Sequence, residues 1–595
     1  MLIQRIVLLL IIENCLSISS PIKPFTIYKY STELQKNVAD LWWNIDENEK
    51  EITFEYHVNT TGWIALGISS AGGMKDADIG IGWIDNYGQV HFQDRYSFDF
   101  IQPIIDNTTN DWIPIQGKEF NGWTAIQFKR LLDTCDTMDV PIKTGTNILI
   151  YAYGLTDPIN SEITYHGTRR GTRIIPLRSY GQPPSEDKFH NMEYFDLQLN
   201  NYIIPSDDTT YHCKIYKTPT KYLTKRHAIA YKILIDNENL DVVHHLLVHE
   251  CDPSFEFNDT NLPHGLCDHI TDQIEPCASR ISTGWAVGGD HIVEFAEEAG
   301  YPVGIHSPNK YFMIQMHYDN PKRLSNRRDN SGIRYYLGNQ LRQHDLGYLS
   351  FGTVSNLLGI IIPPKIDRFI IDSYCPSQAT KNIPQSGLTI LSAFPHTHVQ
   401  GFSIWTKLIR NKTAINYLFN AESYNFNYQF ENRLAKRVQI YPGDEFATRC
   451  IYNTMNKDNV TLGGEKTSEE MCLHFFTYYP RMDGDLSSCY RMNSYQSLQE
   501  KINASAPFNY LIAKQWLLDR KWTKESAKEW QTYLDIVPRT AVFAKGNNWE
   551  GESLDPLATY KDFEPIVCQK SITNIAATLI YQNTFLIIFL FKYVI

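Results

Sequence analysis

The sequence predicts a mainly β protein. Runs such as residues 51–58 (EITFEYHV) and 148–153 (ILIYAY) are rich in β-branched and aromatic residues and are bounded by Gly, Asn and Asp, a pattern typical of β-sandwich strands. Composition agrees, because 43% of the 595 residues are hydrophobic and 13% aromatic, enough for the cores of about three to five domains. A polar link at residues 178–188 separates a first sandwich, residues 25–175, from the rest.

Charge and the two chain ends indicate the compartment. The net charge of −11 and the lack of a long Lys/Arg cluster argue against nucleic acid as a partner. Residues 1–20 predict a signal peptide, with Arg5 before the apolar run 6–12. Residues 575–595 form a hydrophobic tail, which can be a membrane-spanning helix or a signal replaced by a lipid anchor. We therefore expect a lumenal or extracellular protein of the secretory pathway, attached to the endoplasmic reticulum membrane or the cell surface.

Glycosylation and disulfide signals fit that compartment. Six Asn-x-Ser/Thr sequons are candidate glycosylation sites, at Asn59, Asn107, Asn258, Asn411, Asn459 and Asn503. Without Cys15, which leaves with the signal peptide, ten cysteines remain, so an oxidising compartment allows up to five disulfides. Eight of them form two clusters of four, which suggests two separately stapled modules. A thiolate zinc site is disfavoured because no C-x2-C pair occurs.

Histidines supply the candidate metal site. In the stretch 394–401 (FPHTHVQG), His396 and His398 would point the same way on a strand and could hold one ion together. In 241–251 (DVVHHLLVHEC), adjacent His244 and His245 face opposite ways on a regular strand, so geometry alone favours His245 with His249. His244 and His245 can share a metal only at a strand twist, at a sheet edge or through different ring nitrogens. His317 is a remote third donor.

The first module resembles the DOMON domain, a β-sandwich that holds haem or sugar in some relatives. The resemblance rests on residues 62–69 (GWIALGIS), Met74, 76–79 (DADI) and 93–96 (QDRY). His57, His91 and Met74 are nevertheless interpreted as ordinary sandwich residues, because a single histidine in a sandwich is more often a satisfied core residue than a ligand.

The remaining motifs carry a second resemblance. In order along the chain, V-H-H-L, M-H-Y-D-N-P, H-T-H-V-Q-G, E-M-C at 470–472 and Y-Y-P at 478–480 resemble the ascorbate-dependent type II copper monooxygenases, in particular the dopamine hydroxylase and DBH-like branch. The match covers about residues 27–570 and implies two copper ions per chain. One is held by His244, His245 and His317, and the other by His396, His398 and Met471.

The resemblance also implies roles for other residues. His249 becomes a packing or outer residue, and Tyr211 and His396 match positions treated as catalytic, although a buried phenol near Cys213 is an equal alternative for Tyr211. Two β-sandwich, jelly-roll-like copper domains are implied at 195–330 and 345–505, followed by an extension at 506–570 and the tail. The implied disulfides are Cys213 with Cys267, Cys251 with Cys277, Cys375 with Cys489, Cys450 with Cys472, and Cys135 with Cys568. Ala379 stands where dopamine β-hydroxylase begins a further bridge.

Donor chemistry is consistent with this assignment. Three imidazoles suit both oxidation states of copper, whereas a thioether favours Cu(I). By resemblance, ascorbate is the electron donor, one atom of O2 enters an activated C–H bond as hydroxyl, and the other leaves as water. If Met471 lies on a strand, Leu473 and Phe475 share its face, so an apolar wall favours a phenylethylamine-like substrate over a peptide. The reading of both as simple core residues is equally open.

Two other functions remain open at this stage. The chain could be a membrane-tethered copper or DOMON ligand-binding protein without turnover, or a monooxygenase of the same mechanism with another substrate. A zinc hydrolase is disfavoured because zinc gains little from Met471 and no carboxylate has general-base spacing beside H-T-H. Residues 510–530 have apolar residues at helical spacing and predict one helix. The sequence does not indicate the oligomeric state.

Overall fold

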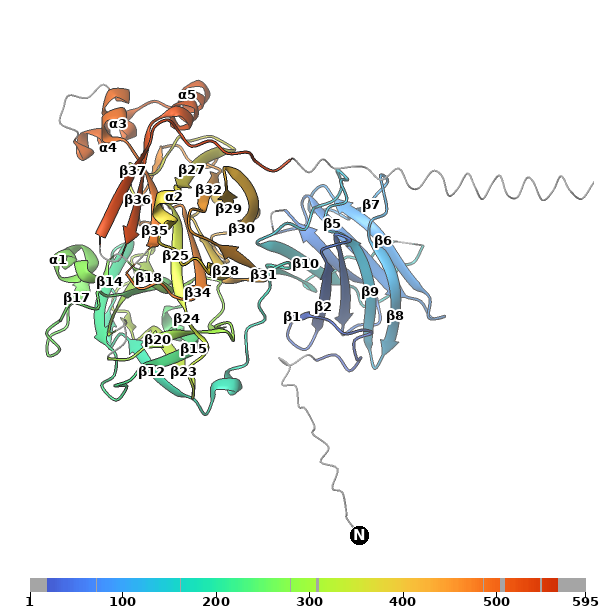
Figure 1. Cartoon of the computed structure of the whole chain (residues 1–595). Helices are drawn as coiled ribbons and strands as arrows, with labels where there is room; N and C mark the ends of the chain where they lie inside the picture. The colour runs from blue at the N-terminus through green and yellow to red at the C-terminus, as the bar shows by residue number, and fades with distance from the viewer. Residues whose placement is uncertain are drawn as a thin grey trace, which may run out of the picture. The chain divides into compact units, whose positions relative to one another are not determined.

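The computed structural model describes residues 19–564, except 71, 161, 279, 306–309, 485, 503–508 and 546–547. It divides into two compact units (Figure 1). The smaller unit comprises Ser17–Ile142 and Ile148–Arg173, and the larger one Lys143–Asn147 and Ile174–Asp562. Both consist mainly of antiparallel strands, so the predicted fold class is confirmed.

The smaller unit is a sandwich of two sheets. One sheet has the order β1 (Tyr30–Gln35), β2 (Ala39–Asp46), β3 (Glu51–Val58), β9 (Trp123–Leu131) and β8 (Ile113–Phe120). The other has the order β11 (Arg170–Ile175), β10 (Asn147–Tyr153), β4 (Ile64–Ser69), β5 (Ala77–Ile84), β6 (Val90–Ser97) and β7 (Ile104–Ile105). Rings from both sheets meet in the core, because Phe128 of β9 lies 5.7 Å from Phe54 of β3 and 5.0 Å from Phe92 of β6.

The larger unit begins with a second sandwich. Its outer sheet runs β12 (Glu193–Gln198), β23 (Gly332–Leu337), β15 (Arg226–Leu234), β20 (Ala299–Val303) and β24 (His344–Asp345), with β19 (Ile292–Glu294) also on β15. Its inner sheet runs β17 (His264–Leu266), β14 (Thr209–Lys217), β21 (Tyr311–Asp319), β16 (Val243–Glu250) and β18 (Ile281–Ala286). A short pair, β13 (Tyr202–Ile203) with β22 (Arg328–Asp329), and the one-turn helix α1 (Thr271–Ile274) complete it. Phe195 and Phe312, with ring centroids 6.4 Å apart, join the two sheets.

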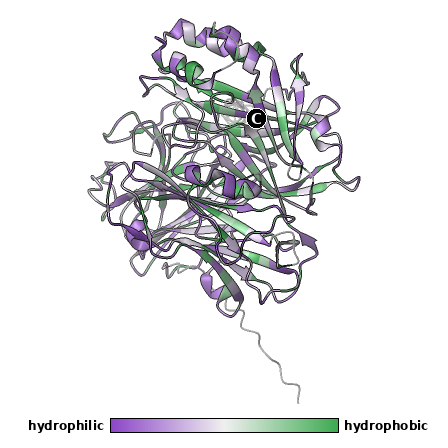
Figure 2. Ribbon diagram, turned by 90° about the vertical axis from the view of Figure 1, so that its left-hand side faces the viewer, coloured by the Kyte–Doolittle hydropathy of each residue, from purple (hydrophilic) through white to green (hydrophobic). Residues whose placement is uncertain are grey.

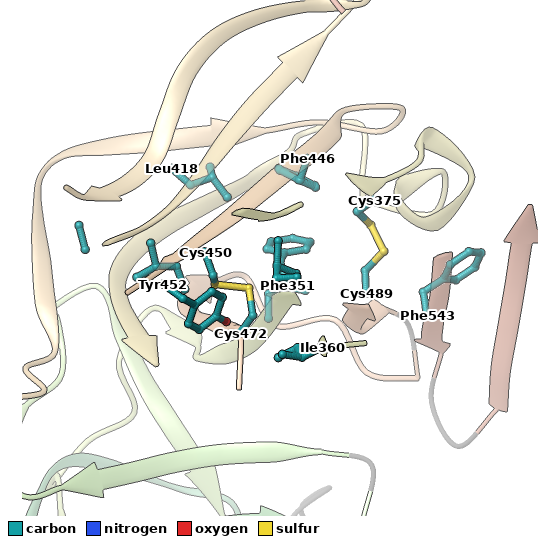
Figure 3. Packing of buried hydrophobic residues seen from close by; sticks show 14 of the residues in the cluster. Phe351, Ile360, Cys375, Leu418, Phe446, Cys450, Tyr452, Cys472, Cys489 and Phe543 are labelled. Carbon is teal, nitrogen blue, oxygen red and sulfur yellow. A yellow bond between two sulfur atoms is a disulfide. The ribbon is translucent and has the colours of Figure 1, made fainter. Parts of the chain in front are cut away.

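A third sandwich follows in the same unit. Its long sheet runs β31 (Asn432–Ile440), β28 (Leu388–His396), β34 (Leu473–Tyr479), β25 (Gly347–Thr353), β35 (Leu486–Asn493), β36 (Arg539–Lys545) and β37 (Asn548–Leu554). Its short sheet runs β27 (Phe369–Cys375), β32 (Glu445–Tyr452), β29 (Gly401–Arg410) and β30 (Thr413–Ala421). The strands β26 (Ile361–Ile362) and β33 (Thr461–Leu462) pair, and α2 (Ser377–Thr380) is a single turn. Phe351 and Phe446 meet between the sheets at 4.4 Å, next to two disulfides (Figure 3).

Helices cover one end of this third sandwich. They are α3 (Tyr495–Lys501), α4 (Tyr510–Asp519) and α5 (Lys524–Ile536). The single helix predicted over 510–530 is therefore two helices, because Thr523 caps α5 with a capping box and the chain is extended at Arg520. Ala527, Trp530 and Leu534 form the buried face of α5. Figure 2 accordingly shows hydrophilic and hydrophobic stretches alternating along the helices at the top of the view.

Candidate metal centre

A β-bulge places two adjacent histidines on one site. Along β16 and β21 the pairing passes from Val243 with Tyr318 directly to His245 with His317. His244 is thus an extra residue without a partner across the ladder, which removes the alternation expected of a regular strand. The three rings gather as a result, with centroid distances of 5.5 Å between His244 and His245, 4.5 Å between His245 and His317, and 5.2 Å between His244 and His317.

The three Nδ1 atoms converge with a spacing suited to a metal ion. The Nδ1 of His245 lies 3.3 Å from that of His244 and 3.2 Å from that of His317. Nitrogen donors about 2.0 Å from one ion in a trigonal arrangement would be about 3.5 Å apart. Burial lowers the pKa of His244 to about 4 and those of His245 and His317 further, so all three rings are neutral, as metal ligation requires. His249, which local geometry favoured, is not in this cluster.

Tyr211 belongs to the surroundings of this cluster. On β14 it lies opposite His317, and the two rings stack at 4.4 Å with an angle of 1°. Its hydroxyl donates to the main-chain carbonyl of Glu465, and burial raises the pKa of the phenol. Tyr211 also packs against the hydrophobic cluster that contains Cys213, which agrees with the buried-phenol alternative, whereas a catalytic role for Tyr211 stays a prediction.

The H-T-H pair lies at the end of a strand. His396 is the last residue of β28 and lies opposite Leu473 of β34, whereas His398 lies in the turn before β29. The prediction that both lie on one strand is therefore wrong for His398. The turn nevertheless keeps the rings close, with centroids 5.3 Å apart and planes at 88°.

Hydrogen bonds orient both rings of this pair. The Nδ1 of His396 is 2.8 Å from the amide oxygen of Gln429, and the Nδ1 of His398 is 2.9 Å from the carbonyl oxygen of Glu469. An Nδ1–H that donates to an oxygen leaves Nε2 as the free lone pair for a metal ion. Burial lowers the pKa of both rings, to about 3 for His398, so this pair is also neutral.

Glu470 brings Met471 to the histidine pair. Its carboxylate accepts the main-chain N–H groups of His398 at 2.8 Å, Gln400 at 2.6 Å and Met471 at 3.2 Å. Burial raises the pKa of Glu470 to about 8, although the three N–H donors oppose that rise. One side chain thus fixes the backbone of two candidate ligands.

The Met471 side chain lies outside the hydrophobic core. The next residue, Cys472, is fully buried and bonded to Cys450, and neighbouring side chains in extended chain point to opposite sides. Met471 itself is partly exposed and precedes β34 by two residues. Its side chain is therefore not part of the packed interior, and its main chain is tied to that of His398 through the Glu470 carboxylate.

The two donor sets are close to each other. The rings of His245 and His396 are 6.1 Å apart at 82°. Phe426 lies between the sets, stacked on His244 at 4.7 Å and 5.8 Å from His398. The larger unit therefore holds both sets in one neighbourhood, at the junction of its two sandwiches.

Several of these supporting residues were missed in the sequence. Gln429 and Phe426 lie in the loop between β30 and β31 and match no motif. Glu470 was visible in E-M-C, but nothing in the spacing shows that its carboxylate accepts three N–H groups.

Four disulfides staple the larger unit. They join Cys213 to Cys267, Cys251 to Cys277, Cys375 to Cys489, and Cys450 to Cys472, which are four of the pairs that the resemblance implies. The fifth expected pair, Cys135 with Cys568, includes a residue outside the described part of the chain. Residues 1–18 of the predicted signal peptide, the predicted hydrophobic tail and Asn503 also lie outside it.

The candidate glycosylation sites of the described residues lie at the surface. The remaining five sequon asparagines are all exposed, at Asn59, Asn107, Asn258, Asn411 and Asn459. No helix in the described ranges combines the length and hydrophobicity needed to cross a membrane.

The histidines of the smaller unit have ordinary partners. His57 is buried, with its ring nitrogens 2.8 Å from Ser20 Oγ and 2.7 Å from Glu55 Oε1. His91 bonds Asp85 at 2.9 Å and stacks on Trp83. Both rings are therefore satisfied by the sandwich, as expected.

The smaller unit also buries an acidic cluster. Asp78, Asp94 and Asp139 lie close together, and Arg130 pairs with Asp78. Burial raises the pKa of Asp94 to about 7 and that of Asp139 to about 8. Arginine already supplies the compensating positive charge at this cluster.

Comparisons with known proteins match all three sandwiches. Residues 195–325 match the family model for the copper type II ascorbate-dependent monooxygenase N-terminal domain, and residues 345–502 match its C-terminal domain. Residues 35–154 match the DOMON domain. Each match coincides with one of the sandwiches described above.

Several curated proteins are similar over most of their length. The mouse DBH-like monooxygenase protein 2 is 30% identical over 533 residues, which are 89% of this chain and 84% of the relative. The human DBH-like monooxygenase protein 1 is 28% identical, covering 89% of each chain. Dog dopamine beta-hydroxylase is 30% identical over 76% of this chain and 71% of its own. The chain therefore belongs to the copper type II ascorbate-dependent monooxygenase family and carries a DOMON domain.

Proposed function

We propose that this protein hydroxylates an activated C–H bond of a small aromatic amine of the phenylethylamine type, using O2 and ascorbate. We further propose two copper ions per chain. His244, His245 and His317 would hold one ion, and His396, His398 and Met471 the other. When bound, copper supplies the redox chemistry that activates O2, with ascorbate as the source of electrons.

The convergence of three neutral imidazoles carries this proposal. Two imidazole nitrogens can share one proton in a hydrogen bond. The Nδ1 of His245 can form such a bond with either His244 or His317, but the Nδ1 atoms of both lie 3.2–3.3 Å from it, so one of them is left without a proton-sharing partner. A metal ion satisfies all three lone pairs. Nearby, the same unit orients two further histidines through their Nδ1 atoms and ties the main chain of Met471 to that of His398, which supports a softer donor set suited to Cu(I).

The protein's own residues position and enclose the site. Gln429 and the carbonyl of Glu469 hold the rings of His396 and His398, and Glu470 holds the turn against Met471. Phe426 contacts rings of both donor sets, and it limits the water that reaches them. These contacts fix the ligands before any metal arrives.

An apolar wall next to the site supports an aromatic substrate. Phe475 of β34 and Phe394 of β28 pair across the sheet, with ring centroids 6.5 Å apart. Both are only partly buried and lie two residue pairs along the ladder from His396 and Leu473. An aryl ring would pack on them better than a peptide carboxylate would.

Turnover and metal content test the proposal together. Purified chain with copper and ascorbate should hydroxylate tyramine or dopamine with O2 uptake, and metal analysis should find two coppers per chain. Turnover of amidation-type peptides alone would overturn the substrate class. Copper retention without ascorbate-dependent O2 uptake would favour a binding protein without turnover, and one zinc per chain would favour hydrolysis.

We also propose the cellular compartment of the protein and the bounds of its domains. We place the protein in the secretory pathway, supported by the four disulfides, with membrane attachment through the carboxyl-terminal tail. We assign the copper domains to about 195–330 and 345–505, and the DOMON sandwich to about 25–175.

A further inference from the structure

The outer face of one sheet of the smaller unit buries three ionisable side chains. Phe54 of β3 points into the sandwich core, so Glu55 and His57 of the same strand point to the opposite face. Asp40 of β2 lies directly across from His57 and therefore shares that face. All three are buried completely, with 0% exposure. Since the outer face of an antiparallel sheet is commonly solvated, another part of the chain must cover these groups.

The segment 19–25 is this cover. Ile22 is buried in a hydrophobic cluster with residues of β9, the strand next to β3. Phe25 donates its main-chain N–H to both carboxylate oxygens of Glu55, at 2.9 Å each. The segment is thereby held on the sheet by an apolar contact and by a polar one.

Ser20 contacts two of the buried groups. Its Oγ lies 2.8 Å from Nδ1 of His57, whose Nε2 lies 2.7 Å from Oε1 of Glu55. Its main-chain nitrogen donates to Oδ2 of Asp40 at 2.9 Å. Ser20 is therefore part of the folded sandwich, and a chain without it would leave both His57 and Asp40 short of a partner.

Asp40 has no cationic partner among the described residues. Its Oδ2 accepts the main-chain N–H groups of Ser19 and Ser20, at 3.1 and 2.9 Å, while its Oδ1 accepts no hydrogen bond in the part of the chain that the structure describes. His57, which faces it across the two strands, bonds Ser20 and Glu55 instead. Burial raises the pKa of Asp40 to about 6 although the two N–H donors oppose that rise. A buried carboxylate without a positive charge beside it is costly to keep.

The sequence has a processing signal at the same point. Ser17 and Ser19 are small residues two positions apart, the pattern that precedes the cleaved bond of a signal peptide. Cleavage after Ser19 makes Ser20 the first residue of the mature chain. Cleavage one residue later, at the end of the predicted signal 1–20, would remove Ser20 together with its three hydrogen bonds. The contacts of Ser20 therefore favour the earlier bond.

We propose that the bond between Ser19 and Ser20 is the processing site of this chain, and that the α-ammonium group formed there pairs with the buried carboxylate of Asp40. An endopeptidase of the secretory pathway adds water across this amide. The C–N bond breaks, the oxygen of water joins the carbonyl carbon of Ser19 to give a carboxylate on the departing peptide, and the nitrogen of Ser20 takes up both protons as an ammonium group.

Processing thus changes what faces the buried carboxylate. In the unprocessed chain, Asp40 accepts two neutral N–H groups on one oxygen. After cleavage, the nitrogen of Ser20 carries three N–H donors and a full positive charge, so it compensates the charge of Asp40 and can also satisfy Oδ1. The cover segment 19–25 then begins at Ser20, and its first atom is fixed on β2 by an ion pair.

Mass spectrometry of the full-length chain, expressed through the secretory pathway of a eukaryotic cell line, tests the cleavage. Trypsin should release the peptide 20–29 (SPIKPFTIYK), because the bond between Lys23 and Pro24 resists the enzyme. The amino terminus of this peptide should be a free amine on Ser20. Any other first residue, or a retained signal peptide, overturns the proposal.

Cyanate measures the ion pair, because it carbamylates only the neutral form of an amine. A negative charge within hydrogen-bond distance raises the pKa of an amine by roughly one to three from its value of about 8 for a free α-amine. At pH 7 the α-amine of Ser20 should therefore react at least about tenfold more slowly in native protein than in the same protein unfolded in guanidinium chloride. Equal rates overturn the ion pair.

Asp40→Asn separates the effect of charge from that of burial, because asparagine keeps the size of the side chain and one acceptor oxygen. In native Asp40→Asn the α-amine should react on the order of tenfold faster than in native wild type. Asp46→Asn, at the exposed end of the same strand, should react like wild type. An unchanged rate in Asp40→Asn, or an equal change in Asp46→Asn, overturns the pairing with Asp40. The comparison of native with unfolded wild type needs no variant, so it decides the matter even if Asp40→Asn does not fold.

Discussion

Replacing Glu470 by glutamine should loosen Met471 and His398 at the same time. The carboxylate accepts three main-chain N–H groups, at 2.6, 2.8 and 3.2 Å, with both oxygens. A glutamine side chain offers only one acceptor oxygen. Its NH2 group is a donor and cannot accept a hydrogen bond from the main-chain N–H that it would face. At least one buried donor then loses its partner, which costs about 2 kcal/mol.

Two measurements should follow from that loss. Calorimetry should show a Tm about 2–3 °C lower for the transition of the larger unit. Copper content under increasing chelator should show one ion lost at 10- to 100-fold lower chelator concentration, and X-ray absorption should show the copper–sulfur contribution disappearing first. The histidine-only site should keep its ion, because none of its three ligands contacts Glu470.

Glu469→Gln is the matched control. Its side chain bonds only the main-chain N–H of Lys466, at 3.2 Å, in a solvent-exposed position, and its carbonyl, which orients His398, is unchanged by the substitution. If Glu470→Gln kept wild-type Tm and both coppers at wild-type affinity, or if Glu469→Gln matched its losses, the positioning role assigned to Glu470 would be refuted.

Three further changes address other parts of the molecule. Met471→Leu removes the thioether and should reduce product formation at least 100-fold with an unchanged fold, whereas exposed Met455→Leu should have no effect; a rate near wild type would exclude ligation by Met471. Tyr211→Phe keeps the stacked ring, so kcat/KM should fall less than about tenfold, and a loss above about 1000-fold would assign the phenol a chemical role. Acidification from pH 7.5 to 5.5 should move the two calorimetric transitions of copper-free protein in opposite directions. Burial lowers the pKa of His249 to about 4, below its unfolded value of about 6.5, so its contribution is full above pH 6.5 and falls by about 1.4 kcal/mol at pH 5.5. Burial raises the pKa of Asp139 to about 8 and that of Asp94 to about 7, above their unfolded values of about 4, so protonation stabilises the smaller unit as pH falls. Asp139→Asn should reduce that gain and leave the share of Asp94. Transitions that both rose or both fell would contradict this assignment.

Local patterns predicted the strands well and the site only in part. The run 51–58 is β3 to the residue, because its alternation and flanking turn residues are local properties. The grouping of His244 with His245 could not be derived that way. It depends on a bulge relative to β21, about seventy residues later in the chain, and strand register is a property of two segments. Only the resemblance to the copper monooxygenases predicted that His244 and His245 belong to one site.

Long-range contacts also explain what was missed. Gln429 acquires its role because β31, which begins three residues later, pairs with β28, and no spacing within 426–431 reveals that pairing. The single helix expected at 510–530 failed for a local reason, since Thr523 is a strong cap inside an otherwise helical pattern. A cavity lined by Leu247, Phe394 and Phe475 exists only where strands of two sandwiches meet.

The unpaired His244 has a consequence for how the protein acquires metal. Its extra position on β16 points toward the site only while β21 holds the neighbouring residues in register. In a partly folded chain, His244 and His245 are present without His317 beside them. Tight binding of an ion therefore requires that β16 and β21 have paired first. Ion binding at the proposed site would consequently report on completed assembly of the inner sheet.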